Sequence, residues 1–117
     1  MKIKESDIQK SVIEWLSWHK DIYFTRNNSF AGSFTRRDGS KGWIKNCKAG
    51  SPDIIVCYKG KYIGLEIKCI GGKQSELQKQ AECDIIRSGG RYYIIRDLKD
   101  IEKLFKQCHK KKYHKIV

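Results

Sequence analysis

Three charged residues stand in a stretch of sequence that otherwise suits burial. Asp53 opens an apolar run directly after Pro52, and Glu66 and Lys68 lie in a second run that is rich in isoleucine. Residues two apart on a strand project from the same face, so Glu66 and Lys68 should project together while Ile67 faces the other way. Charged groups in such a setting are costly unless they pair or bind something.

The types of these residues suggest what they could bind. Two carboxylates that paired strands bring together can hold a hard divalent cation through oxygen, the ligand atom that Mg²⁺ prefers. A lysine beside them can orient a water molecule or neutralise charge on a phosphate. The alternative is a structural ion network of Asp53, Lys68 and Glu66 at the edge of a sheet.

A β-hairpin is the element that would place these side chains together. The two apolar runs flank the sequence Tyr58-Lys59-Gly60-Lys61, which predicts a tight polar turn. A helix before the next strand permits a parallel crossover, so we expect an α/β fold with a mixed four-stranded sheet and helices on its faces. The other expected elements are helices over 5–19, from Ser75 to Gly89 and from Asp97 to about Cys108, and strands over 21–26 and 91–96.

Two further polar residues could reach the acids. Ile8, Val12 and Leu16 form the apolar stripe of the first helix, and at about 100° per residue Glu5 falls on the same face one turn earlier. Glu5 could instead only complement the helix N-terminus, as acids in a first turn often do. Gln78 stands three residues after Ser75, which is the capping-box position of the next helix.

The segment between Arg26 and Gly50 is long and basic, and aromatic residues are interleaved with its cations. Residues 34–37 and 42–45 could form a small hairpin around Asp38-Gly39. Basic residues with interspersed aromatics suit contact with a phosphate backbone and exposed bases. The alternative is a solvated loop whose aromatics anchor it to the core. The expected DNA contacts are Arg26, Asn27, Asn28, Arg36, Arg37, Lys41, Lys45 and Lys48.

Composition narrows the class of partner. The chain of 117 residues suits one domain, and 25 Lys and Arg against 13 Asp and Glu give a net charge of +12. So positive a field favours nucleic acid or an anionic membrane surface. No apolar run approaches the roughly 20 residues that span a bilayer, so we expect a soluble cytoplasmic protein without a membrane partner. The five cysteines include no Cys-x-x-Cys pair, which favours reduced and mostly packed thiols over a zinc site.

The ordered set of motifs resembles the PD-(D/E)XK nucleases, and in particular their VRR-NUC branch (virus-type replication-repair nucleases) in the small stand-alone form seen in phages. The resemblance covers roughly residues 5 to 105. Its pieces are Glu5 with Ile8-Gln9, Arg26-Asn27-Asn28, Gly50-Ser51-Pro52-Asp53, Gly64-Leu65-Glu66-Ile67-Lys68, Ser75 with Gln78, and Gly89-Gly90.

This resemblance implies an αβββαβ core and metal-dependent hydrolysis of DNA phosphodiester bonds. It also implies that Glu5 joins the metal cluster and that Gln78 points toward the active site. The expected ligands of one or two Mg²⁺ or Mn²⁺ ions are Asp53, Glu66, the carbonyl of Ile67 and Glu5. Lys68 is expected to orient the attacking water or to stabilise developing charge.

Stand-alone members of this branch act as structure-selective nucleases, including on four-way junctions, in replication, recombination or repair. A homodimer would place two active sites on two strands of a symmetric junction. Residues 109–117 form a basic tail to the single domain. Two alternatives remain open: a non-catalytic DNA-binding module on a nuclease fold, and the nuclease subunit of a restriction or packaging complex.

Overall fold

The computed structural model describes residues 3–27, 31–45 and 48–105, of which the side chains at 31, 32, 44 and 45 are not described. The expected α/β fold is confirmed, with a mixed four-stranded sheet and three helices. The elements are α1 (Glu5–Ser17), β1 (Tyr23–Arg26), β2 (Ala31–Thr35), β3 (Lys41–Lys45), β4 (Ile54–Tyr58), β5 (Lys61–Ile67), α2 (Glu76–Arg87) and β6 (Arg91–Ile95), followed by a helix over 98–105.

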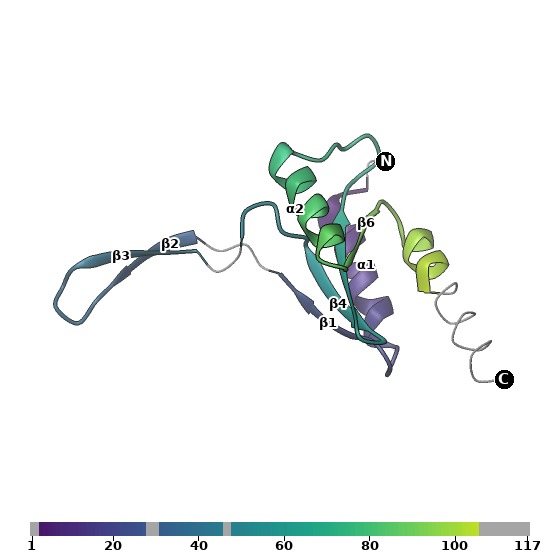
Figure 1. The fold of residues 1–117 in the computed structure, drawn as a ribbon, viewed down its shortest axis with the longest axis horizontal. Helices are drawn as coiled ribbons and strands as arrows, with labels where there is room; N and C mark the ends of the chain where they lie inside the picture. The colour runs from purple at the N-terminus through teal and green to yellow at the C-terminus, as the bar shows by residue number, and fades with distance from the viewer. Residues whose placement is uncertain (1–2, 28–30, 46–47, 106–117) are drawn as a thin grey trace.

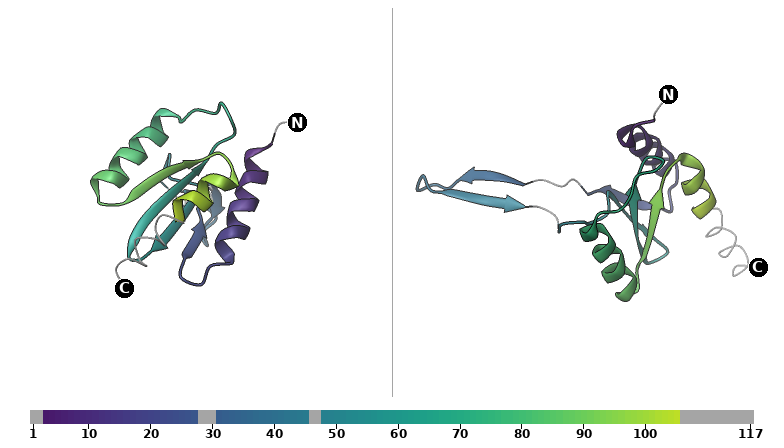
Figure 2. Two further views of the ribbon diagram at one scale, coloured as in Figure 1. Left: turned by 90° about the vertical axis from the view of Figure 1, so that its right-hand side faces the viewer. Right: turned by 90° about the horizontal axis from the view of Figure 1, so that it is seen from above.

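The sheet has the strand order β1-β4-β5-β6. β4 pairs antiparallel with both β1 and β5, whereas β5 and β6 run parallel because α2 connects them. Figure 2 shows α1 and the helix over 98–105 on one face of the sheet and α2 on the other. A second, two-stranded sheet is formed by β2 and β3, which project from the body as a separate hairpin (Figure 1).

The core lies between the sheet and the first and last helices. Val12 and Leu16 of α1, Ile101 and Phe105 of the last helix and Leu65 of β5 are completely buried there. By contrast, α2 contributes no buried residue. The two faces of the sheet are therefore unequal: one is sealed by apolar packing, and the other is covered loosely by a polar helix.

The turn between β4 and β5 requires an unusual backbone conformation. Lys59 and Gly60 both have positive φ, at 54° and 77°, which are the values of the two central residues in a type I′ turn. This turn matches the right-handed twist of the strands and sets the register in which Ile54 lies opposite Leu65. The predicted β-hairpin is thus confirmed.

Several expectations need adjusting. The first helix ends at Ser17 rather than at residue 19. The expectation of mostly packed thiols is wrong for Cys57 and Cys83, which are exposed; Cys57 lies on β4 but faces away from the core. The basic tail over 109–117 lies outside the described residues. Among the helices that the structure describes, none is long and apolar enough to cross a membrane.

Candidate active site

The two acids of the motif meet where β4 begins and β5 ends. Asp53 directly precedes Ile54, the first residue of β4, and Glu66 directly follows Leu65, the partner of Ile54. Asp53 Oδ2 accepts a hydrogen bond from the backbone N–H of Ile67 at 2.8 Å. Because the ladder between β4 and β5 starts at Ile54, this carboxylate takes the place that a strand carbonyl would otherwise occupy.

The backbone around Asp53 is held from two sides. Pro52 is fully buried, and its ring fills the space beside Gly64, where any Cβ would lie 2.5 Å from Pro52 Cγ. Directly after β1, the backbone N–H of Asn27 donates to the Asp53 carbonyl at 2.8 Å, and the Asn27 side chain donates to the Pro52 carbonyl at 3.0 Å. The Pro-Asp and Gly-x-Glu sequences are therefore two halves of one packing arrangement.

Glu66 is the one buried charged residue of the described chain, with 2% of its surface exposed. Its Oε2 accepts a hydrogen bond from Gln78 Nε2 at 3.2 Å, whereas its Oε1 is buried without a partner among the described residues. Burial raises the pKa of Glu66 to about 8; the neighbouring Asp53 carboxyl and the negative charge of Glu5 raise it further, and the positive charge of Lys68 opposes the rise. Two carboxyl groups this close together, one of them buried, need a proton or a cation to balance their charge.

Gln78 has both of the roles that the sequence offered as alternatives. Its backbone N–H donates to Ser75 Oγ at 3.2 Å, and its Oε1 accepts from the Ser75 N–H at 2.9 Å, which completes the capping box at the start of α2. The remaining amide nitrogen donates to Glu66. Because the cap fixes the amide oxygen, it also points the amide nitrogen at the acid.

Glu5 and Lys68 lie near the pair without bonding to it. Glu5 is the exposed first residue of α1, and its charge affects the pKa of Glu66 less than burial, Asp53 or Lys68 does. In the described part of the chain, no group of three His, Cys, Asp or Glu residues could hold a metal ion, so a part for Glu5 as a ligand stays a prediction. The ion pairs among the described residues are Lys48–Asp84 and Lys79–Glu76. Lys68 therefore pairs with neither Asp53 nor Glu66, and the alternative of a structural ion network of these three residues is not observed.

Tyr92 was not anticipated from the sequence. It is 7% exposed, and its hydroxyl accepts a hydrogen bond at 3.2 Å from Gln74 Nε2, which also donates to Glu82 at 3.1 Å. Burial raises the pKa of Tyr92 to about 12; the bond from Gln74 opposes the rise, and the charges of Glu66, Glu82 and Asp53 add to it. In the parallel pair of β5 and β6, Tyr92 lies opposite Gly64 and so on the sheet face that carries Glu66. Only the register of these two strands shows that Tyr92 is close to Glu66.

The residues expected to contact DNA separate into groups. Arg26 is exposed at the end of β1, whereas the Asn27 side chain is bonded within the protein. Arg36, Arg37 and Lys41 are exposed on the β2–β3 hairpin, which projects away from the four-stranded sheet (Figure 1). Asn28 and the side chain of Lys45 lie outside the described residues.

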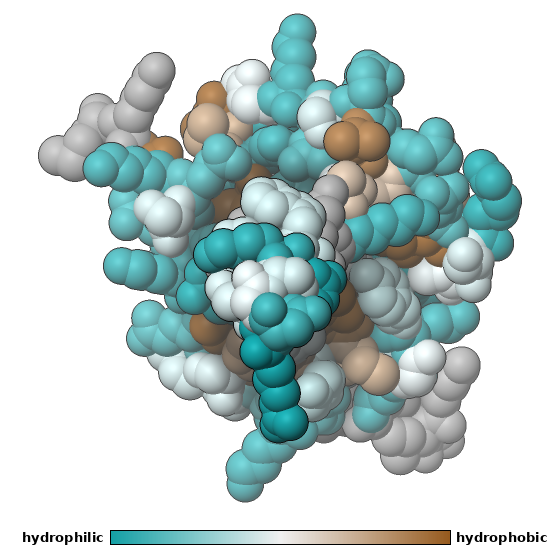
Figure 3. All heavy atoms as spheres, turned by 90° about the vertical axis from the view of Figure 1, so that its left-hand side faces the viewer, coloured by the Kyte–Doolittle hydropathy of each residue, from teal (hydrophilic) through white to brown (hydrophobic). Residues whose placement is uncertain are grey.

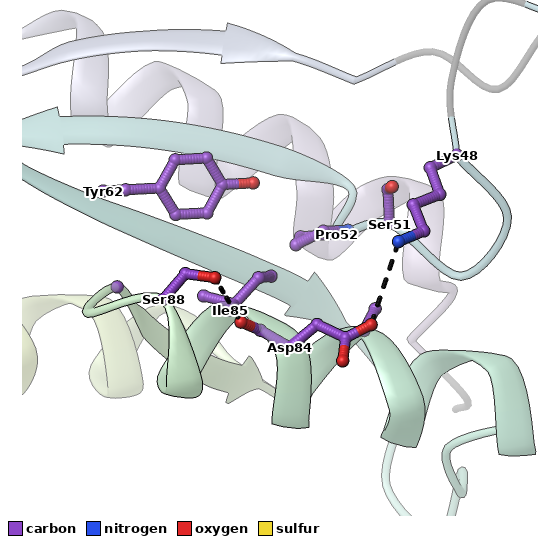
Figure 4. Close-up of a pocket in the computed structure, with 9 residues that line it drawn as sticks. Lys48, Ser51, Pro52, Tyr62, Asp84, Ile85 and Ser88 are labelled. Atoms are coloured by element: carbon purple, nitrogen blue, oxygen red, sulfur yellow. Dashed lines mark hydrogen bonds and ion pairs between the residues drawn. The ribbon is translucent and has the colours of Figure 1, made fainter.

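Lys48 lies at the rim of a pocket of about 420 Å³ between α2 and the sheet. Its ammonium group is 3.8 Å from Asp84 Oδ2, and Pro52, Tyr62 and Ile85 form the apolar walls (Figure 4). Neither Asp53 nor Glu66 lines this pocket. The acid pair is therefore a separate site, and Lys48 is partly neutralised by Asp84.

Compared with protein-family models and with curated proteins, the chain matches none. The nuclease resemblance therefore depends on the ordered motifs and on the geometry described above.

Proposed function

We propose that this protein is a metal-dependent DNA endonuclease that hydrolyses phosphodiester bonds. The observation that carries the proposal is the juxtaposed pair of Asp53 and Glu66, of which one buried oxygen, Glu66 Oε1, has no partner among the described residues. A buried oxygen without a partner costs free energy, so it marks a place where a ligand is needed.

The residues present fit one Mg²⁺ or Mn²⁺ ion. Both donors are carboxylates, and Mg²⁺ is commonly held by one or two carboxylates while water and substrate phosphate complete its coordination. Asp53 and Glu66 would hold the ion, and the Ile67 carbonyl and Glu5 remain candidates for further ligands. Such an ion supplies Lewis acidity toward a phosphate and lowers the pKa of water as a nucleophile.

The remaining side chains have roles that follow from their positions. Gln78 fixes the orientation of the Glu66 carboxyl through its hydrogen bond to Oε2. Lys68 lies two residues after Glu66, directly beyond the end of β5, and forms no ion pair with either acid, so its ammonium group is available to orient water or to stabilise charge on the phosphate. The exposed guanidinium of Arg26 can position the nucleic-acid backbone.

The net charge and the family resemblance suggest the substrate class. The net charge of +12 favours DNA as partner. Branched DNA, including four-way junctions, is the substrate that the resemblance suggests, and a homodimer would supply one acid pair for each of two strands. Work in replication, recombination or repair in a bacterial or phage-infected cytoplasm would suit this activity.

The test is a cleavage assay on linear, nicked, flap and four-way DNA, with and without Mg²⁺ or Mn²⁺. We expect cutting that requires metal and is strongest on branched DNA. Asp53→Asn and Glu66→Gln should each lower the rate by about two orders of magnitude or more, the scale of losing a key electrostatic contact in the transition state. DNA binding should persist in both variants, because neither substitution removes a positively charged side chain.

Glu14→Gln is the matched control, since Glu14 is an exposed acid of α1. It should cut like the wild type. If the wild-type protein with metal cuts none of these substrates yet binds them, the non-catalytic DNA-binding module is the better description. Indiscriminate nicking would instead favour the subunit of a restriction or packaging complex.

A further inference from the structure

The β2–β3 hairpin is an arm without a packing partner among the described residues. The hydrophobic core includes none of the arm's described side chains, and Trp43 is 71% exposed and Phe34 41% exposed. Figures 1 and 2 show both strands projecting away from the four-stranded sheet. Seen end-on, the tip of the arm presents mostly hydrophilic residues (Figure 3).

The tip of the arm is ordered by its own hydrogen bonds. Asp38 Oδ1 accepts from the backbone N–H and from the hydroxyl of Ser40, at 2.9 and 2.6 Å. The backbone N–H of Arg36 donates to the Ser40 carbonyl at 2.8 Å and so closes the turn. An isolated two-stranded hairpin is only marginally stable in water, so these contacts matter for keeping the arm folded.

A second set of contacts fixes one cation of the arm. The Arg36 guanidinium lies 5.1 Å from the centroid of the Phe34 ring and donates to the Lys41 carbonyl at 2.8 Å. Both groups occupy the space over Gly42, where a Cβ would lie 2.5 Å from the Phe34 ring and 2.6 Å from Arg36 Nη2. Arg36 is thus held in place rather than free to move, which lowers the entropy cost of using it in binding.

The positive charge of the arm favours a polyanion as its binding partner. Residues 31–45 carry four cations and one acid, Asp38, in a chain that is already strongly basic. Two copies of this arm would repel each other, whereas a polyanion would be attracted.

The cations and aromatics are distributed over both faces of the ribbon. Directly paired residues share a face, so Trp43, Ser33 and the hydrogen-bonded pair Lys41–Thr35 lie on one side, with Lys41 Nζ 3.2 Å from Thr35 Oγ1. Phe34 and Arg36 lie on the other side. A ribbon that docks flat on a surface needs one charged face, whereas a ribbon inside a groove meets phosphates on both walls.

We propose that the β2–β3 hairpin enters the major groove of a DNA duplex that flanks the phosphodiester at the acid pair. This inference rests on the proposed function and deepens it, because it requires the substrate to carry a duplex arm. The major groove of B-DNA, about 12 Å wide, admits a two-stranded ribbon. At about 3.3 Å per residue, a five-residue strand covers roughly 17 Å, or about five base pairs. The major groove of A-form RNA is too deep and narrow for such an arm.

The experiment measures binding without cleavage, by fluorescence anisotropy in chelator, on a DNA duplex, on an RNA duplex of the same sequence and on one single strand of that DNA. The double variant Arg36→Ala/Arg37→Ala should bind the DNA about tenfold more weakly, and the slope of log affinity against log salt should fall by about two. Trp43→Ala leaves the charge unchanged and should weaken DNA binding about threefold to tenfold. Neither change should matter on the RNA duplex.

Lys20→Ala/Lys61→Ala is the matched control, because it removes the same charge from exposed sites beyond α1 and at the β4–β5 turn, remote from Asp53 and Glu66. It should have much less effect on DNA binding. Thermal melting of each variant checks that the body keeps its fold, as expected for side chains outside the core.

Other results would overturn the inference. Equal losses on DNA and RNA would make the arm a general electrostatic patch, and a loss confined to single-stranded DNA would make it a base-stacking element. Unchanged DNA affinity with a loss of dimer in sedimentation would make it a contact between copies of the chain. If the acid variants abolish cutting while the arm variants bind normally, only the arm inference fails. If nothing is cut but the arm variants lose DNA duplex binding selectively, only the proposed activity fails.

Discussion

At the scale of single residues, the buried carboxyl of Glu66 makes the stability of the protein depend on pH. Its pKa is about 8 in the folded protein against an ordinary value of 4.5. Between these two values the folded state keeps a proton that the unfolded state has released, so the free energy of unfolding decreases as the pH rises. One such group changes the free energy of unfolding by at most about 1.4 kcal/mol per pH unit.

Glu66→Gln should remove this dependence. Glutamine keeps the shape of the side chain and can still accept from Gln78, but it has no proton to lose. We expect the metal-free variant to exceed the wild type in stability at pH 8 and to lose less stability between pH 5 and pH 8, as measured by urea unfolding. Glu14→Gln should keep the wild-type profile. A Glu66→Gln profile that parallels the wild type would show that another group controls the pH dependence.

The two roles of Gln78 can be separated by substitution. Glutamate at this position can still close the capping box, but it loses the N–H donor to Glu66 and adds a like charge. Gln78→Glu should therefore unfold at close to the wild-type temperature while cutting DNA at least about tenfold more slowly. Ser75→Ala is the converse variant: loss of the cap should cost about 1 kcal/mol in thermal unfolding and should spare most of the activity. Equal effects of both substitutions on cleavage would argue against a separate role for the bond to Glu66.

At the scale of elements, the β4–β5 turn contains a local strain that can be relieved. Lys59 has a φ of 54°, which costs a residue with a β-carbon about 1 kcal/mol. Lys59→Asn should raise the free energy of unfolding by about 0.5 to 1 kcal/mol, because asparagine before glycine suits a type I′ turn. Lys61→Asn, which changes the same side chain at a β5 position without positive φ, should give no such gain. Chemical denaturation of both variants measures the difference.

The elements themselves could largely be predicted from the sequence. Ile8, Val12 and Leu16 repeat with helical spacing, and the β4–β5 hairpin follows from two apolar runs around a short polar turn; both patterns are local. The β2–β3 arm was predicted as a small hairpin, but its separation from the body was not, because no local pattern says what an exposed aromatic packs against. The end of α1 at Ser17 also escaped prediction, since helix ends depend on a few weak contacts.

At the scale of the whole molecule, the site could be predicted only where its residues share one hairpin. Asp53 and Glu66 meet because β4 and β5 are neighbours in the chain. Tyr92, Gln74 and Glu82 could not be assigned, because their proximity depends on the parallel register between β5 and β6, which spacing along the sequence does not fix. For the same reason, the sequence could not decide whether Gln78 caps α2 or points toward the acids, since only the packing of α2 on the sheet brings its amide to Glu66.

The bond from the Ile67 N–H to Asp53 makes a single backbone amide a reporter of the state of the site. Its exchange with deuterium is controlled by a side chain, whereas the exchange of Ile63, in the middle of β5, is controlled by opening of the sheet. Asp53→Ala should speed exchange at Ile67 and leave Ile63 slow. Added Mg²⁺ or Mn²⁺ should slow exchange at Ile67 in the wild type, because an ion held by Asp53 restrains its carboxylate. If exchange at Ile67 responds to neither change, Asp53 does not bind the ion. One resonance in the spectrum can therefore report whether an ion occupies the site before any DNA is present.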